Sequence, residues 1–137
     1  MFYIIVTIAA VLAAIGITFN YIAHLGTIVK IAREGEQEGM GVQAVMTRFF
    51  FATVLIEMIP IAIIIISFLL LDRPAEGIPT VPLVIILAAM IFGIIQVATR
   101  MKQDVPDEMK NQVRSFSLLS MQLITSVPIV AIIFMFI

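Results

Sequence analysis

The sequence predicts an all-α membrane protein with four transmembrane helices arranged as two antiparallel hairpins. Three observations predict this class. Residues from the set A, V, I, L, M, F, W, Y and C make up 62% of the chain and charged residues only 12%, whereas about a quarter of a soluble domain is charged. Every one of the eight basic and nine acidic residues except Glu57 falls in three short stretches. The four apolar runs that these stretches delimit are each long enough for the roughly 20 residues that a helix needs to cross a bilayer.

The four runs cover about 2–29, 49–71, 79–99 and 115–137. An unbroken apolar segment in lipid has to satisfy its backbone hydrogen bonds internally, and the runs show no strand-like alternation, so each is expected to be helical. Positive charge follows the first run and does not precede it, which predicts a retained span instead of a signal peptide. Prolines 74, 79 and 82 mark the end of the second run and the start of the third.

Lys and Arg are distributed unevenly among the loops, and the cytoplasmic loops of membrane proteins carry the excess. Seven of the eight lie in the stretches 30–48 and 100–114, and only Arg73 lies in the tight outer turn expected at 72–78. We therefore expect loops 30–48 and 100–114 in the cytoplasm, with the outer turn and both termini outside. The expected membrane is a bacterial plasma membrane.

The two predicted hairpins, 1–71 and 79–137, share a weak internal repeat. Segment 60–68 reads PIAIIIISF and segment 128–136 reads PIVAIIFMF. Two isoleucine-rich spans can look alike by chance, so a duplicated hairpin and an accidental likeness both stay open. Matching the prolines leaves the second hairpin without a counterpart of Glu57.

Composition excludes several classes of function. The formal charge is −1, and the chain lacks the basic surface that binds the phosphates of nucleic acid. Cysteine is absent, and the one histidine, His24, cannot form a multi-histidine metal site within one chain, so we expect no metal. The sequence contains no nucleophile elbow, phosphate-binding glycine loop or pair of carboxylates. We therefore expect neither a cofactor nor an enzymatic activity.

Glu57 is the one charged residue inside an apolar run. An acidic side chain at mid-span costs about 2.5–3.5 kcal/mol on insertion scales, and such residues usually face protein or water and carry ions or protons. Desolvation favours the neutral form, so a carboxyl here can be neutral in lipid and charged where it meets water. Glu57 is therefore either a proton carrier or a structural glutamate that bonds a neighbouring helix.

Four other residues are expected near Glu57, and two of them, Asn20 and Thr53, are expected to form the ion-binding site together with it. Pro60 removes a backbone N–H and can kink the helix beside the carboxyl, and Thr53 lies one turn earlier on the same face. Asn20, on the first span, is the expected hydrogen-bond partner of Glu57. His24, one turn further toward the cytoplasm, is either a proton relay or an interfacial hydrogen-bonding residue. Asn20 belongs to a stripe of small or polar residues that predicts close packing across the hairpin, namely Ala9, Ala13, Gly16, Asn20, Ala23 and Thr27.

Segment 55–61, LIEMIPI, resembles the Leu-x-Glu-x-x-Pro-Ile segment around the ion-carrying carboxylate of the proteolipid subunit c of rotary ATP synthases and ATPases. The likeness covers the first hairpin. Ile31-Ala32-Arg33-Glu34 resembles the end of that family's first helix, where a loop contacts the central stalk, and Asn20 stands near a glutamine of sodium-binding members. The resemblance implies an oligomeric ring in lipid, in which Glu57 is loaded, carried and unloaded at a separate stator subunit.

The chain also departs from that family. Alanines replace most glycines of the first helix, Arg33-Glu34-Gly35 replaces Arg-Gln-Pro, and a second hairpin is fused on, as in vacuolar-type proteolipids. Met58 and Ile59 follow Glu57 where a sodium site commonly has a hydroxyl ligand, so H⁺ is favoured over Na⁺ as the transported ion. Two hypotheses result. One is an H⁺-carrying ring subunit with rotary-complex partners, and the other is a non-transporting ring scaffold or pore in which Glu57 and Asn20 only pack helices.

Overall fold

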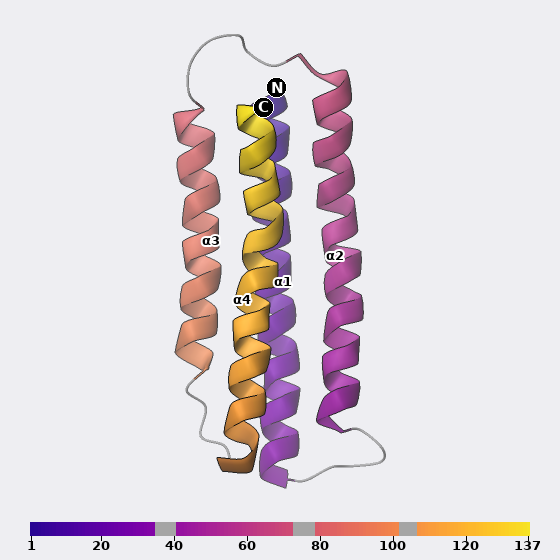
Figure 1. Ribbon diagram of the computed structural model, residues 1–137, viewed down its shortest axis with the longest axis vertical. Coiled ribbons are helices and arrows are strands. Elements are labelled where there is room, and N and C mark those ends of the chain that lie inside the picture. The colour runs from indigo at the N-terminus through magenta and orange to yellow at the C-terminus, as the bar shows by residue number, and fades with distance from the viewer. Residues whose placement is uncertain (35–40, 73–78, 102–106) are drawn as a thin grey trace.

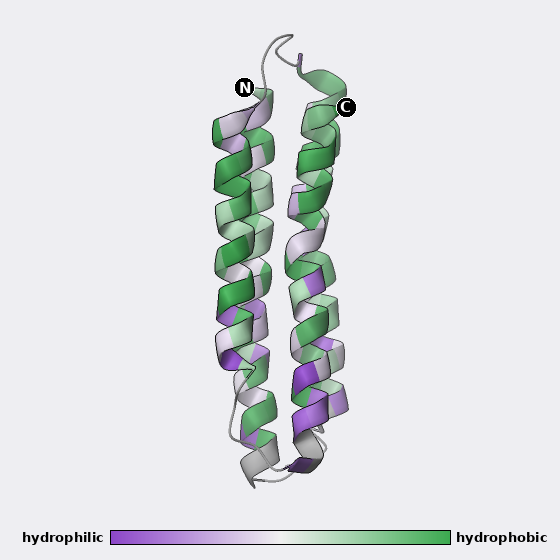
Figure 2. Ribbon diagram, turned by 60° about the vertical axis from the view of Figure 1, so that its left-hand side comes forward, coloured by the Kyte–Doolittle hydropathy of each residue, from purple (hydrophilic) through white to green (hydrophobic). Residues whose placement is uncertain are grey.

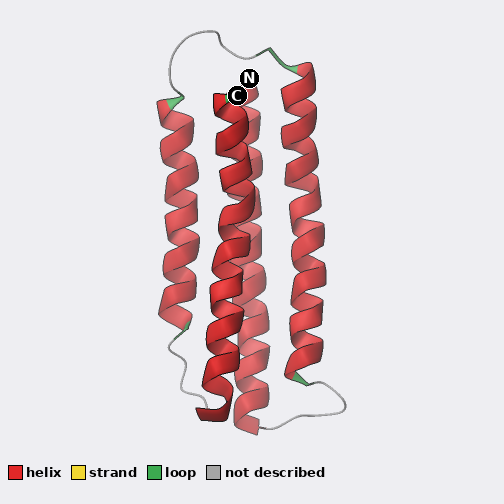
Figure 3. Cartoon of the chain, in the orientation of Figure 1, coloured by secondary structure: helices red, strands yellow, loops and turns green. Residues whose placement is uncertain are grey.

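The chain folds into four long helices (Figure 1). The computed structural model describes residues 1–34, 41–72, 79–101 and 107–137, and within these ranges it contains no strand (Figure 3). All four helices are long and apolar enough to cross a membrane, as in a multi-pass integral membrane protein. The prediction of an all-helical chain with four spanning helices is confirmed. Their bounds are α1 (Phe2–Glu34), α2 (Val42–Leu70), α3 (Thr80–Arg100) and α4 (Asp107–Phe136).

Three of the helices extend beyond the apolar runs that predicted them. α1 continues to Glu34 and not only to about 29, α2 begins at Val42 and not at 49, and α4 begins at Asp107 and not at 115. Hydrophilic residues gather at this end of the bundle, opposite the two termini (Figure 2). Hydropathy marks where a span leaves the lipid, whereas a helix can continue into water as long as its backbone hydrogen bonds form.

Two of the predicted turns lie mostly outside the described residues. They are the glycine-rich turn expected within 34–41 and the outer turn expected at 72–78, of which the structure describes the flanking residues. α1 with α2 and α3 with α4 run antiparallel, and both termini lie at the same end (Figure 1). This arrangement fits a chain whose termini share one side of the membrane.

α1 and α4 form the centre of the bundle. α1 contacts each of the other three helices, and so does α4. α2 and α3 lie on opposite sides of this pair and make no contact with each other over their described residues (Figure 1). Every contact between the two hairpins over these residues therefore involves α1 or α4.

Aromatic rings from three helices pack together between Glu57 and the hydrophilic end of the bundle. Tyr21 of α1, Phe49 of α2 and Phe116 of α4 are fully or almost fully buried. The ring of Phe116 stacks on Tyr21 at 5.4 Å between centroids and meets the ring of Phe49 edge to face at 4.7 Å. The Tyr21 hydroxyl pairs with Ser117 Oγ at 2.7 Å. Such ring pairs contribute about 0.5–1.5 kcal/mol each beyond their buried area, so this cluster fixes α4 against the first hairpin.

Two glycines allow helices to approach closely. A Cβ atom at Gly16 of α1 would lie 2.9 Å from Ile56 Cγ2 of α2. A Cβ atom at Gly93 of α3 would lie 2.6 Å from Ile124 Cγ2 of α4 and 2.9 Å from Thr18 Oγ1 of α1. Gly16 belongs to the small-residue stripe, and its contact with α2 agrees with the packing expected across the first hairpin. Ala23, another member of the stripe, is exposed and does not take part in this packing.

α4 begins with an ion pair outside the apolar span. The Asp107 carboxylate lies 2.9 Å from Lys110 Nζ. The hydrogen bond and the charge of Lys110 hold the pKa of Asp107 below its usual value. Stabilisation from a lowered carboxyl pKa is present at neutral pH and is lost as the pH falls through that pKa. Both side chains are exposed, so the effect on folding is small.

Candidate functional site

Glu57 lies near the middle of α2 and is half-buried where α2 meets α4. Its Oε1 accepts a hydrogen bond from Ser126 Oγ of α4 at 2.9 Å. Asp107 and Lys110 form the only ion pair among the described residues. No described basic side chain therefore forms an ion pair with Glu57. The described partner of the carboxyl is therefore a neutral hydroxyl and not a cation.

Ser126 is absent from the residues that the sequence predicted for this site. The signal that could have found it is the pair Thr125-Ser126 within the fourth apolar run, because matching the two prolines of the repeat places Thr125 opposite Glu57. In the structure the Thr125 hydroxyl lies within hydrogen-bond distance of two carbonyl oxygens of its own helix, 3.1 Å from that of Met121 and 3.0 Å from that of Gln122. It is the adjacent serine that reaches the carboxyl group.

The hydrogen bond expected between Asn20 and Glu57 does not form. Asn20 Nδ2 instead donates to Thr53 Oγ1 at 3.1 Å and to the Phe49 carbonyl oxygen at 3.2 Å. The register of the hairpin explains the difference. Because Gly16 of α1 packs against Ile56, Asn20, one turn further along α1, lies level with Thr53 and not with Glu57.

Thr53 is 1% exposed, and its hydroxyl has an unusual environment for this protein. The backbone carbonyl four residues before Thr53, that of Phe49, accepts a hydrogen bond from Asn20 Nδ2. Asn20 is therefore a positioning residue for Thr53, one turn before Glu57 on the same face of α2. By contrast, six other threonine hydroxyls donate to the carbonyl four residues earlier in their own helix, namely Thr7, Thr18, Thr27, Thr47, Thr99 and Thr125.

His24 continues this polar row toward the hydrophilic end. Its Nδ1–H donates to the Asn20 carbonyl oxygen at 2.9 Å, and its ring meets Phe49 edge to face at 5.8 Å. His24, Asn20 and Thr53 thus follow one another along the α1–α2 interface toward Glu57. The proton-relay role of His24 stays a prediction.

The other predicted site residues are placed less fully. Pro60 is buried, and α2 continues as a helix through it. α1 includes Arg33 and Glu34, but the loop contacts predicted for them fall outside the described side chains. Among the residues that the structure describes, no group of three or more His, Asp and Glu side chains could hold a metal ion.

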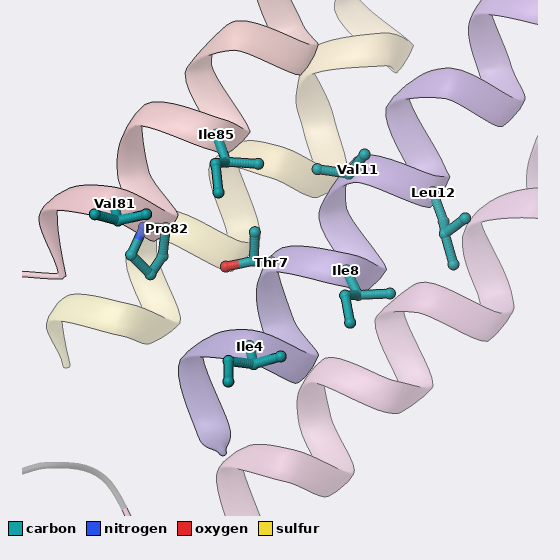
Figure 4. A pocket seen from close by; sticks show the side chains of 8 residues that line it. All are labelled: Ile4, Thr7, Ile8, Val11, Leu12, Val81, Pro82 and Ile85. Carbon is teal, nitrogen blue, oxygen red and sulfur yellow. The ribbon is translucent and has the colours of Figure 1, made fainter.

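A groove elsewhere on the bundle is not a candidate polar site. It has a volume of about 490 Å³ and lies between the start of α1 and the start of α3 (Figure 4). Its walls are aliphatic side chains such as Ile4, Ile8, Val81 and Ile85. The one hydroxyl in the lining, that of Thr7, already donates to the Tyr3 carbonyl oxygen. The groove therefore offers no free polar group to a ligand.

Asn20→Leu is expected to lower the free energy of unfolding by only about 1 kcal/mol. The reason is that the Thr53 hydroxyl can then donate to the vacated Phe49 carbonyl, as other threonines here do. A double-mutant cycle with Thr53→Val, followed by circular dichroism during denaturant titration of the detergent-solubilised protein, should give a coupling energy of about 1 kcal/mol. Thr47→Val, which removes an exposed hydroxyl, is the control and should change little. Strict additivity of Asn20→Leu and Thr53→Val would contradict the assigned bond.

Comparisons of the chain with protein-family models, with curated proteins and with solved structures find no match. The likeness to subunit c therefore rests on sequence segments of the first hairpin, of which 55–61 is the most specific.

Proposed function

We propose that this protein is a membrane proteolipid that carries H⁺ on Glu57 as a subunit of a ring similar to that of rotary ATPases. One observation carries the proposal. A half-buried carboxyl in the middle of a spanning helix has a hydroxyl, that of Ser126, and no described cation as its partner. Such a group can be neutral in lipid and ionised at water, which is the behaviour that a proton carrier requires.

The location of Glu57 at the edge of the bundle supports this role. α2 lies at one side of the central pair α1 and α4, and its residues next to Glu57 point outward. Met58 is 60% exposed and Ile59 is 68% exposed. A carboxyl beside an exposed apolar surface can be approached from lipid or by another subunit. The proposal therefore includes lipid, further copies of this chain and a separate stator-like subunit as partners.

The packing of the two hairpins supports a ring. α1 contacts α3 and α2 contacts α4, so the hairpins lie side by side with corresponding helices adjacent. In the proposed ring, further copies continue this side-by-side packing until the circle closes. In this proposal segments 30–48 and 100–114 face the cytoplasm and both termini lie outside a bacterial plasma membrane.

H⁺ is the proposed ion because the site offers few oxygen ligands. A dehydrated sodium ion has to be surrounded by several oxygens. The described hydrogen bonds give Glu57 one oxygen neighbour, Ser126 Oγ, and the side chains that follow it, Met58 and Ile59, are apolar. A proton needs only the carboxyl itself and one hydrogen-bond partner.

A structural scaffold or pore is the second candidate. The bond between Glu57 and Ser126 joins α2 to α4, and this is the smallest of the described helix interfaces. A polar bond at such a place can hold two helices together in lipid, where burial of apolar surface gives no drive to associate. In this alternative the ring forms and Glu57 never releases its proton.

Carbodiimide labelling of the purified protein tests the proposal, because the reagent attacks a protonated carboxyl that is accessible from lipid. We expect labelling at Glu57 alone, identified by mass spectrometry, that falls as the pH rises and is not prevented by Na⁺. Particle images of the same detergent-purified sample should show closed circles of identical copies. Protection by Na⁺ would replace H⁺ by Na⁺ as the carried ion. A carboxyl that stays unlabelled at every pH would contradict the carrier role.

A further inference from the structure

The Ser126 hydroxyl lies within hydrogen-bond distance of two acceptors. Ser126 Oγ is 2.9 Å from Glu57 Oε1 and 2.8 Å from the Leu123 carbonyl oxygen of its own helix. A hydroxyl carries one hydrogen, so it can donate to only one of these oxygens at a time. It also has lone pairs and can accept a hydrogen bond. Ser126 can therefore meet Glu57 as a donor, or as an acceptor while its own hydrogen points to Leu123.

We infer that Ser126 changes between these two arrangements as Glu57 loses and gains its proton. When Glu57 is ionised, Ser126 donates to the carboxylate. When a proton arrives from the aqueous side, one O–H bond forms at Oε1, this O–H donates to Ser126 Oγ, and the serine hydrogen turns to the Leu123 carbonyl. The change needs only rotation of one hydroxyl hydrogen. The inference rests on the proposed function only in taking Glu57 as a group that titrates.

The exchange makes both protonation states of Glu57 compatible with one packing of α2 against α4. A fixed donor such as a backbone N–H would favour the ionised form alone, and a fixed acceptor would favour the neutral form alone. The other described hydroxyls near this part of α4 cannot take the same role. Ser117 pairs with Tyr21, Ser120 donates to the Phe116 carbonyl, and Thr125 donates to its own helix. Ser126 is thus a positioning residue whose hydroxyl can form a hydrogen bond with both the ionised and the protonated form of Glu57.

Few other titratable groups can influence Glu57. α2 is packed here against α1 and α4, and it does not contact α3 over the described residues. On α1 the nearest titratable side chains are Tyr21 and His24, which lie beyond Asn20 toward the hydrophilic end, and α4 has no titratable residue after Arg114. On α2 itself the nearest charge is Arg48, more than two turns earlier. The pH dependence of Glu57 should therefore report mainly on its bond with Ser126.

The test is the pH dependence of carbodiimide labelling at Glu57 in the full-length protein reconstituted into vesicles. Ser126→Ala is expected to raise the pH of half-maximal labelling by about one unit, a tenfold change in proton concentration, because the ionised form loses the stronger, charge-assisted bond. Ser126→Thr keeps the hydroxyl and should restore the original midpoint. Thr125→Val removes the neighbouring hydroxyl and should leave the midpoint unchanged. An unchanged midpoint in Ser126→Ala, or an equal shift in Ser126→Thr, would overturn the inference.

Infrared difference spectra separate the exchange from a fixed serine donor. In the exchange the carbonyl of protonated Glu57 accepts nothing from Ser126, so its C=O stretch should hardly change in Ser126→Ala. A fixed donor would lower that frequency in the wild type, and a clear rise in Ser126→Ala would overturn the exchange.

Failure of this inference is distinguishable from failure of the proposed function. If Glu57→Gln stops H⁺ flux while Ser126→Ala has no effect, only the inference fails, and if Glu57 titrates as described but flux survives in Glu57→Gln, only the proposed function fails.

Discussion

Glu57→Gln is expected to reduce H⁺ transport by membranes that contain the native assembly to background. Glutamine keeps the size of the side chain and can still accept a hydrogen bond from Ser126 Oγ, which lies 2.9 Å from the carboxyl in the wild type. It has no proton to release near neutral pH, so the carrier is removed while the packing of α2 against α4 is kept. The measurement is the initial rate of proton movement, followed with a pH-sensitive dye inside sealed vesicles.

Glu57→Asp is the matched control for transport. It retains a carboxyl but withdraws it by about 1.5 Å, the length of one C–C bond, so partial transport is expected. Particle diameter in detergent should be the same for both variants as for the wild type. Full transport by Glu57→Gln would contradict the carrier role. Loss of the circular particles with no transport detectable in the wild type would favour the scaffold alternative.

Gly93→Ala is expected to lower the free energy of unfolding by about 1–3 kcal/mol, the usual cost of adding a methyl group to a packed interior. The new Cβ would lie 2.6 Å from Ile124 Cγ2 and 2.9 Å from Thr18 Oγ1. Both atoms are attached directly to β-carbons, so they can move away only if χ1 rotates or the helix shifts. Isoleucine in a helix strongly prefers one χ1 rotamer, and rotation of Thr18 would break the bond from its hydroxyl to the Ala14 carbonyl. Since these residues belong to α4 and α1, the cost falls on the junction of three helices.

Gly26→Ala is the control for Gly93→Ala. No heavy atom lies within 4 Å of a Cβ built at Gly26, which is also in a helix. Both substitutions gain the same helix propensity, about 1 kcal/mol in water, so their difference isolates the packing cost. Denaturant titration in detergent, followed by circular dichroism, measures this difference. Equal stability of the two variants would mean that α3 does not approach α4 and α1 as closely as described.

The four helices could be predicted from the sequence because lipid imposes a simple rule. A run of apolar residues without alternation has to become a helix of spanning length, and all four runs did so. The outer ends of α1, α2 and α4 could not be predicted in the same way. Polar residues beside a span have similar hydropathy whether they extend the helix or form a loop. The length of each helix outside the apolar run depends on local backbone hydrogen bonds that hydropathy does not report.

The candidate site was predictable in its main residue and not in its partner. Glu57 stands out in the sequence as the one charge in an apolar run, whatever packs around it. The partner depends on register and on which helix lies next to α2. Gly16 against Ile56 moves Asn20 level with Thr53, and Ser126 of α4 occupies the place expected for Asn20. A pattern in one span cannot specify these contacts, because they are set by packing between hairpins.

The central position of α1 has a consequence for how the chain assembles during synthesis. α1 is the first of the four helices to leave the ribosome, and each later helix has a contact surface on it. Every newly inserted helix therefore finds its docking partner already in the bilayer and need not wait for a later one. α2 and α3 share no surface over their described residues, so if α1 were withheld from the translocon, α2 would be left with α4 alone, which arrives last.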